Sequence, residues 1–97
     1  MASVTVLYFG MLRELSRGKK RQERLEIDDR ATLAELIEEI SERNGPKFRD
    51  YIFDASGKLK SALAFAVNGD SIESYVLNSK ECRGVKEFVI LPPISGG

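Results

Sequence analysis

The chain has 97 residues, of which 42% are hydrophobic and 31% charged, a composition typical of one small globular domain and too apolar for a disordered protein. Fifteen basic residues balance fifteen acidic ones, so no net charge attracts nucleic acid or a membrane surface. With no histidine and one cysteine, Cys82, the sequence excludes an internal disulfide, a multi-cysteine zinc site and a histidine base. We therefore expect no metal site and no nucleic-acid or membrane partner, and a reducing, cytoplasmic setting.

The first predicted element is a strand over residues 3–9, where most positions are β-branched or aromatic. Val4, Val6 and Tyr8 share one face of this strand, and Leu7 and Phe9 share the other. A short helical turn is expected over residues 11–16. Charged and apolar residues then alternate over residues 23–28, which predicts a second strand that pairs with the first as an antiparallel hairpin.

The clearest element is a helix that begins after Thr32. Thr32 and Glu35 have the spacing of a capping box, in which each side chain bonds the other residue's backbone N–H. Apolar residues then recur at helical spacing and form one stripe, Leu33, Leu36, Ile37 and Ile40. Gly45 and Pro46 predict the end of the helix, because glycine supplies a left-handed cap and proline blocks continuation. The helix spans about 18 Å, enough to lie across a small sheet.

The second half of the chain is less regular. Residues 46–62 are expected to be irregular, and residues 63–67 read as a third strand that ends at the turn signal Asn68-Gly69. Residues 70–84 are mixed and polar, with apolar side chains that could anchor them locally: Ile72, Tyr75, Val76 and Leu77. Residues 85–91 form the last predicted strand.

The order strand, strand, helix, strand, strand predicts an α+β fold of the β-grasp type, with a mixed sheet packed on one main helix. We expect residues 1–91 to form this domain and residues 92–97 to form an extended tail. One helix covers only one face of such a sheet. If Val4, Val6 and Tyr8 face the helix, then Leu7, Phe9 and Ile90 form an apolar docking patch on the open face, unless the strand phase differs and they are core.

The tail is the most informative feature of the sequence. Pro92 and Pro93 have no backbone N–H and a fixed φ, so they end the ladder and favour a stiff, extended exit. The six residues after the strand could reach roughly 20 Å from the domain. Gly96 and Gly97 have no side chains, so they can enter a narrow cleft with the terminal carboxylate unhindered. This arrangement suits a protein whose own carboxylate is a substrate for another enzyme.

These parts resemble the MoaD/ThiS family of ubiquitin-like sulfur carriers, and within it the small subunit of molybdopterin synthase. The similarity rests on the opening block 6–15 (VLYFGMLREL), the capped helix, the segment 66–69 (AVNG) and the closing block 88–97 (FVILPPISGG). The first and last blocks are specific, whereas the helix is generic. The Pro-Pro approach to the two glycines favours the molybdopterin branch over the thiamin-type carriers.

The resemblance implies a mechanism. Gly97 would be adenylated with ATP by a ubiquitin-activating-type, MoeB-like enzyme and converted to a thiocarboxylate, and the chain itself would bind no cofactor. The tail would then enter the large, MoaE-like subunit of molybdopterin synthase, where the sulfur passes to a pterin precursor. Gly96 and Gly97 carry over as the reactive end, and Leu91, Pro92, Pro93, Ile94 and Ser95 as the segment that threads the partner. The chain would be a small sulfur-carrying subunit with no autonomous active site.

One departure keeps other functions open. The polar segment between Gly69 and Phe88 is longer than in compact members of the family. It leaves room for a ubiquitin-like modifier that acylates lysines of target proteins, or for a carrier in tRNA thiolation. A third reading is a noncovalent ubiquitin-like interaction module whose tail is passive.

Three further features have plain readings beside functional ones. Cys82 has charged neighbours, Lys80 and Arg83, that could lower the pKa of its thiol, but a free loop thiol is the simpler interpretation. The basic residues between Arg17 and Arg24 could bind RNA or an acidic partner. A solvated loop is favoured, because no aromatic residues lie among them to stack on bases. The acidic helix face, Glu35, Glu38, Glu39 and Glu42, is read as a solvated surface rather than an acid–base pair.

Overall fold

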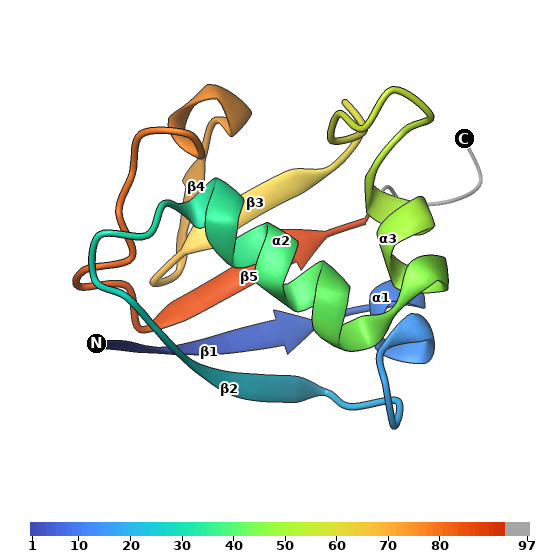
Figure 1. Cartoon of the computed structure of the whole chain (residues 1–97), viewed down its shortest axis with the longest axis horizontal. Coiled ribbons are helices and arrows are strands. Elements are labelled where there is room, and N and C mark those ends of the chain that lie inside the picture. Colours follow the sequence, from blue (N-terminus) through green and yellow to red (C-terminus); the bar gives the residue numbers. More distant parts are fainter. Residues whose placement is uncertain (93–97) are drawn as a thin grey trace.

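A computed structural model describes residues 1–92 of the chain (Figure 1). The elements follow in the order β1 (Ala2–Tyr8), α1 (Met11–Leu15), β2 (Gln22–Ile27), α2 (Leu33–Asn44), α3 (Pro46–Ile52), β3 (Ala64–Val67), β4 (Asp70–Ile72), a 3-10 helix η1 (Ser74–Val76) and β5 (Glu87–Leu91). In the part of the chain that is described, no helix has the length and apolar character that a membrane span requires.

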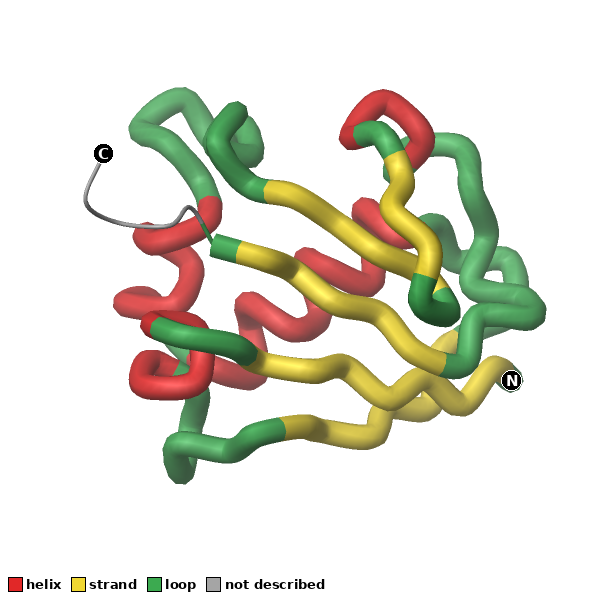
Figure 2. Tube along the Cα trace, turned by 180° about the vertical axis from the view of Figure 1, so that it is seen from behind, coloured by secondary structure: helices red, strands yellow, loops and turns green. Residues whose placement is uncertain are grey.

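The five strands form one mixed sheet in the order β2-β1-β5-β3-β4. β1 pairs antiparallel with β2 and parallel with β5, and β3 pairs antiparallel with both β5 and β4. Figure 1 shows α2 lying across this sheet, and the view from behind in Figure 2 shows the other face of the sheet open. The predicted α+β, β-grasp fold is confirmed.

The core lies between α2 and the sheet. Val4, Val6 and Tyr8 of β1 are 0%, 0% and 2% exposed, so the predicted inward face of this strand is correct. Helix α2 buries its apolar stripe, Leu33, Leu36, Ile37 and Ile40. Its start is the predicted capping box: the Thr32 hydroxyl accepts from the Glu35 N–H, and the Glu35 carboxylate accepts from the Thr32 N–H at 2.9 Å. The helix ends at Gly45, whose φ of 95° is one that glycine tolerates.

Helix α3 corrects the expectation of an irregular segment after Pro46. Pro46 does end α2, but it also occupies the first turn of the next helix, where its missing N–H costs nothing. Phe48 and Ile52 are four residues apart and fully buried. The Phe48 ring meets the Tyr8 ring edge-on, with centroids 5.6 Å apart, so α3 closes the core at the carboxyl end of β1.

A hydrogen-bond network ties the edge of the sheet to α2 around Tyr8. The Tyr8 hydroxyl donates to Glu23 Oε1 of β2 at 2.9 Å and accepts from Asn44 Nδ2 at 3.1 Å. Arg43 and Lys20 place cations 3.5 and 3.8 Å from Glu23 Oε2. Burial raises the pKa of Tyr8, because the phenolate would lose its hydration there. Tyr8 therefore stays protonated, and its hydroxyl continues to donate the hydrogen bond to Glu23.

The segment after β3 contains a short strand that the sequence did not indicate. Asn68 and Gly69 both have positive φ, 50° and 89°, as a tight hairpin turn requires, and they connect β3 to β4. Of the expected local anchors, Leu77 is buried and Ile72 and Val76 are partly buried. Tyr75 is 78% exposed, so the expectation that it anchors this segment is wrong.

Candidate functional site

The predicted tail leaves the domain from a central strand. β5 lies between β1 and β3, and its last residue, Leu91, pairs with Ala64 of β3. Leu91 is 40% exposed, and Pro92, at which the strand has ended, is half-buried. The remaining predicted tail residues, Pro93, Ile94, Ser95, Gly96 and Gly97, lie outside the described residues.

Gly10 lies beside the exit of this tail. Because β1 and β5 are parallel, their carboxyl ends meet at the same edge of the sheet. Gly10 follows β1 with φ 56° and ψ −131°, a conformation open to glycine and strained for other residues. A Cβ built on Gly10 would lie 3.5 Å from Pro92 Cγ, which is ordinary contact. The backbone at Gly10 thus forms one wall of the exit.

An apolar surface lies beside this exit on the open face of the sheet. β-strand alternation and the strand register place five residues on that face: Leu7, Ala64, Ala66, Val89 and Leu91. Together with Phe9, the exposed residue that directly follows β1, we call them the sheet patch. Leu7 pairs with Val89, and Val89 with Ala66, so these three lie in one row across the central strands. Phe9 and Leu91 are 47% and 40% exposed at the end nearest the tail.

The structure corrects one member of the predicted docking patch. Leu7 lies on the open face and Phe9, one residue past β1, is exposed, but Ile90 is 1% exposed and belongs to the core. Ile90 pairs with Tyr8, whose side chain faces inward, so Ile90 faces inward too. Its neighbours in β5, Val89 and Leu91, take the outward positions instead. The strand pairing, which the sequence alone does not give, decides this phase.

Cys82 is a free thiol in the loop before β5, as expected, but it is buried. Its side chain is 0% exposed, its N–H donates to the Ala31 carbonyl at 2.7 Å, and its Sγ lies 3.7 Å from the Thr32 carbonyl oxygen. Burial, together with the negative charge of Glu35, raises the pKa of Cys82 to about 11. The suggestion that neighbouring cations lower this pKa is therefore wrong, and the thiol is a poor nucleophile at neutral pH.

Part of each charged surface noted in the sequence is engaged in ion pairs. In the basic loop, Lys19 lies 4.0 Å from Glu14, and Lys20 pairs with Glu23. On the acidic face of α2, Glu38 forms a bidentate pair with Arg49 at 2.8 and 3.2 Å, and Glu39 accepts from Arg43. We therefore take the tail exit and the sheet patch, rather than these charged surfaces, as the candidate functional site.

Comparison with known proteins decides the family. The ThiS family model matches residues 6–97, nearly the whole chain and including the terminal glycines. The chain belongs to the ThiS family of ubiquitin-like sulfur carriers. A search of curated proteins found no significant match.

Solved structures share the fold over their whole length. SAMP1 of Haloferax volcanii is 22% identical, with a TM-score of 0.82 over 98% of this chain and 99% of that chain. The small archaeal modifier protein 1 (SAMP1) of Methanosarcina acetivorans is 25% identical, with a TM-score of 0.74 over 100% and 98%. A protein of Pyrococcus furiosus described as molybdopterin converting factor, subunit 1, is 27% identical, with a TM-score of 0.68 over 97% and 100%.

Proposed function

We propose that this ThiS-family chain is a cytoplasmic sulfur carrier for molybdopterin biosynthesis and that Gly97 carries the sulfur. The observation that carries the proposal is the apolar sheet patch beside the strand from which the Gly-Gly tail leaves. Two comparisons support it: the family match extends through residue 97, and the Pyrococcus furiosus relative is described as a molybdopterin converting factor subunit.

The chemistry requires a partner for every catalytic step. A free carboxylate is a poor electrophile, so a ubiquitin-activating-type, MoeB-like enzyme transfers AMP from ATP to the Gly97 carboxylate and releases pyrophosphate. A sulfide-level nucleophile, hydrosulfide supplied by a sulfur donor, then attacks the acyl carbon; the bond from that carbon to the AMP oxygen breaks, and AMP and a proton leave, which gives the thiocarboxylate. The chain contributes the acyl group and the recognition surface, and it binds no cofactor itself.

The sheet patch is the surface that we assign to the adenylating enzyme. A partner that covers Phe9 and Leu91 lies directly at the exit of the tail, so docking and delivery of Gly97 are coupled by geometry. Gly10 lies close to Pro92, the last described residue, at the start of the tail, so a partner on the sheet patch also meets the backbone at Gly10. After sulfur loading, the segment from Leu91 to Ser95 threads a MoaE-like large subunit, where the pterin precursor accepts the sulfur.

A second function uses the same activated carboxylate. The likeness to two SAMP1 proteins favours a ubiquitin-like modifier, in which a lysine amine of a target protein attacks the adenylated or thioester-linked Gly97. A carrier for tRNA thiolation would use the same steps with another acceptor. A noncovalent interaction module would need none of them.

Deletion of Gly96 and Gly97 separates these functions. We expect the full chain to support ATP–pyrophosphate exchange by the adenylating enzyme and to restore molybdopterin synthesis in cells that lack their own small subunit, whereas the deleted chain does neither. High-mass conjugates that disappear with the deletion, without any restoration of molybdopterin, would establish the modifier instead. Restoration by the deleted chain would leave only the noncovalent module.

A further inference from the structure

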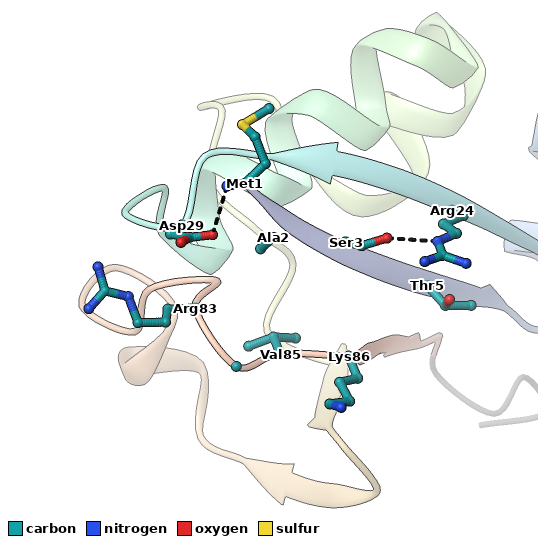
Figure 3. Close-up of a pocket in the computed structure, with 10 residues that line it drawn as sticks. Met1, Ala2, Ser3, Thr5, Arg24, Asp29, Arg83, Val85 and Lys86 are labelled. Atoms are coloured by element: carbon teal, nitrogen blue, oxygen red, sulfur yellow. Dashed lines mark hydrogen bonds and ion pairs between the residues drawn. The ribbon is translucent and has the colours of Figure 1, made fainter.

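A second surface on the same sheet face carries three cationic side chains. A pocket of about 460 Å³ lies at the beginning of β1, at the opposite end of the open face from the tail exit (Figure 3). Arg24 of β2 and Arg83 and Lys86 of the loop before β5 line it, together with Ser3 and Thr5 of β1. We call this the basic pocket.

The charge of the basic pocket is concentrated in an otherwise neutral protein. Asp29 is its one carboxylate lining residue in the described part of the chain, and its Oδ1 lies 3.4 Å from the Met1 amino group. Glu26 and Glu87 point to the same side of the sheet without lining the pocket. Arg24 is held in place because its Nε donates to Ser3 Oγ at 2.7 Å, and its terminal amino groups have no hydrogen-bond acceptor among residues 1–92 (Figure 3).

The basic pocket and the sheet patch are continuous along β1. Thr5 and Leu7 point to the same face and are separated by about 7 Å, two residues of extended chain. A stable interface buries about 800 Å² on each partner, equivalent to a disc of about 16 Å radius. A protein centred on Leu7 therefore extends over Thr5 and Ser3 and covers the pocket as well as the patch.

The arrangement of the cationic residues in the basic pocket indicates what kind of group they bind. Arg24 lies on β2 and Lys86 just before β5, so their backbones are separated by two strand spacings, about 10 Å, and Figure 3 shows their side chains pointing in different directions. This span suits separate carboxylates on a peptide better than one tetrahedral anion. Among the described residues that line the pocket, none is aromatic, so none offers a ring on which a nucleic-acid base could stack.

We infer that the basic pocket binds a carboxylate-rich segment of the protein that docks on the sheet patch. The inference rests on the proposed docking face but not on the chemistry of Gly97. The basic pocket adds an electrostatic contact that accelerates association and orients the partner, while the sheet patch supplies most of the affinity. An acidic segment on the partner, opposite the start of β1, is the complement that this surface requires.

A titration of the isotope-labelled full chain tests the inference without any partner. The probe is a blocked hexaglutamate peptide at low ionic strength, and the readout is the amide NMR shifts. We expect shifts at Ser3, Thr5, Arg24 and residues 83–86, and binding about tenfold or more weaker in the double variant R83E/K86E. The matched control R21E/K47E has the same net charge and changes two exposed cations elsewhere, so it should bind the peptide like the unchanged chain.

Three results would overturn the inference. Shifts centred on the basic loop 17–21, or equal weakening in both double variants, would show attraction by net charge alone. Stronger binding of inorganic phosphate than of the peptide at these amides would make the pocket a small-anion site. Stronger binding of polyuridine there would make it an RNA contact. Failure of the proposed function is distinguishable, because then no adenylation occurs with any variant, whatever the peptide does.

Discussion

Replacing Phe9 with alanine tests whether the sheet patch is a docking surface. Phe9 exposes 47% of its surface and lies beside the tail exit. With about 200 Å² for the whole side chain, roughly 90 Å² is available to a partner, and its burial contributes about 2 kcal/mol at 25 cal/mol per Å². Loss of that contribution weakens docking by about 30-fold. Phe9 is not part of the core cluster, so the fold should remain intact.

The assay is ATP–pyrophosphate exchange by the adenylating enzyme, with the chain as the varied substrate. We expect F9A to raise KM by about 10- to 30-fold with kcat nearly unchanged, because the lost contact is made equally in the ground and transition states. Y75A is the matched control, since Tyr75 is an aromatic residue that is 78% exposed on η1, away from the patch. Equal KM values for F9A, Y75A and the unchanged chain, all with intact melting curves, would refute the docking role of the patch.

Three further predictions concern the domain. G10A should lower the free energy of unfolding by about 1–2 kcal/mol, because strain at φ 56° exceeds the small entropic gain of alanine, and urea unfolding measures it. T32A should cost about 1 kcal/mol by removing the cap of α2, with no change if the capping box is absent in solution. The pKa of Cys82 is raised from 9.0 to about 11 in the folded chain, so above pH 9 the thiol ionises more readily in the unfolded chain. The contribution of Cys82 to the free energy of unfolding is therefore complete below pH 9 and falls by about 1 kcal/mol by pH 10. The stability difference between the unchanged chain and C82A should therefore shrink between pH 7 and pH 10, and a constant difference would contradict the raised pKa.

The parts of the fold that followed from the sequence are those with a local physical signal. The stripe from Leu33 to Ile40 and the capping box at Thr32 defined α2, and alternation in β1 identified its inward face. Once β1 was assigned, the open face with Leu7 and Phe9 followed from having one main helix.

The predictions that failed depend on contacts between segments that are distant in the sequence. Phe88, Val89 and Ile90 are three consecutive apolar residues that are all at most 8% exposed, so their sequence does not reveal which of them faces outward. Only the pairing of Ile90 with Tyr8 shows it. Cys82 has charged neighbours in sequence but packs against the backbone at Ala31 in space, which reverses the expected direction of its pKa shift.

Pro46 shows a different limit of sequence reasoning. Proline after Gly45 is a strong stop signal for one helix and an equally good start signal for another. Helix α3 is only seven residues long, too short for its periodicity to be distinctive, and its stability comes from burying Phe48 and Ile52. The basic pocket could not be predicted for a related reason: Arg24 and Lys86 are distant in the sequence and line one pocket only because the sheet places β2 and β5 on either side of β1.

Intact-mass analysis of the full chain shows whether Gly97 carries sulfur. The chain is incubated with its adenylating enzyme, ATP and a sulfur donor, and a chain truncated before Gly96 serves as the control. We expect one oxygen of the full chain to be replaced by sulfur, the change to map to Gly97, and the truncated chain to be unaltered. An unchanged mass, with the same enzyme active on another carrier, would contradict it.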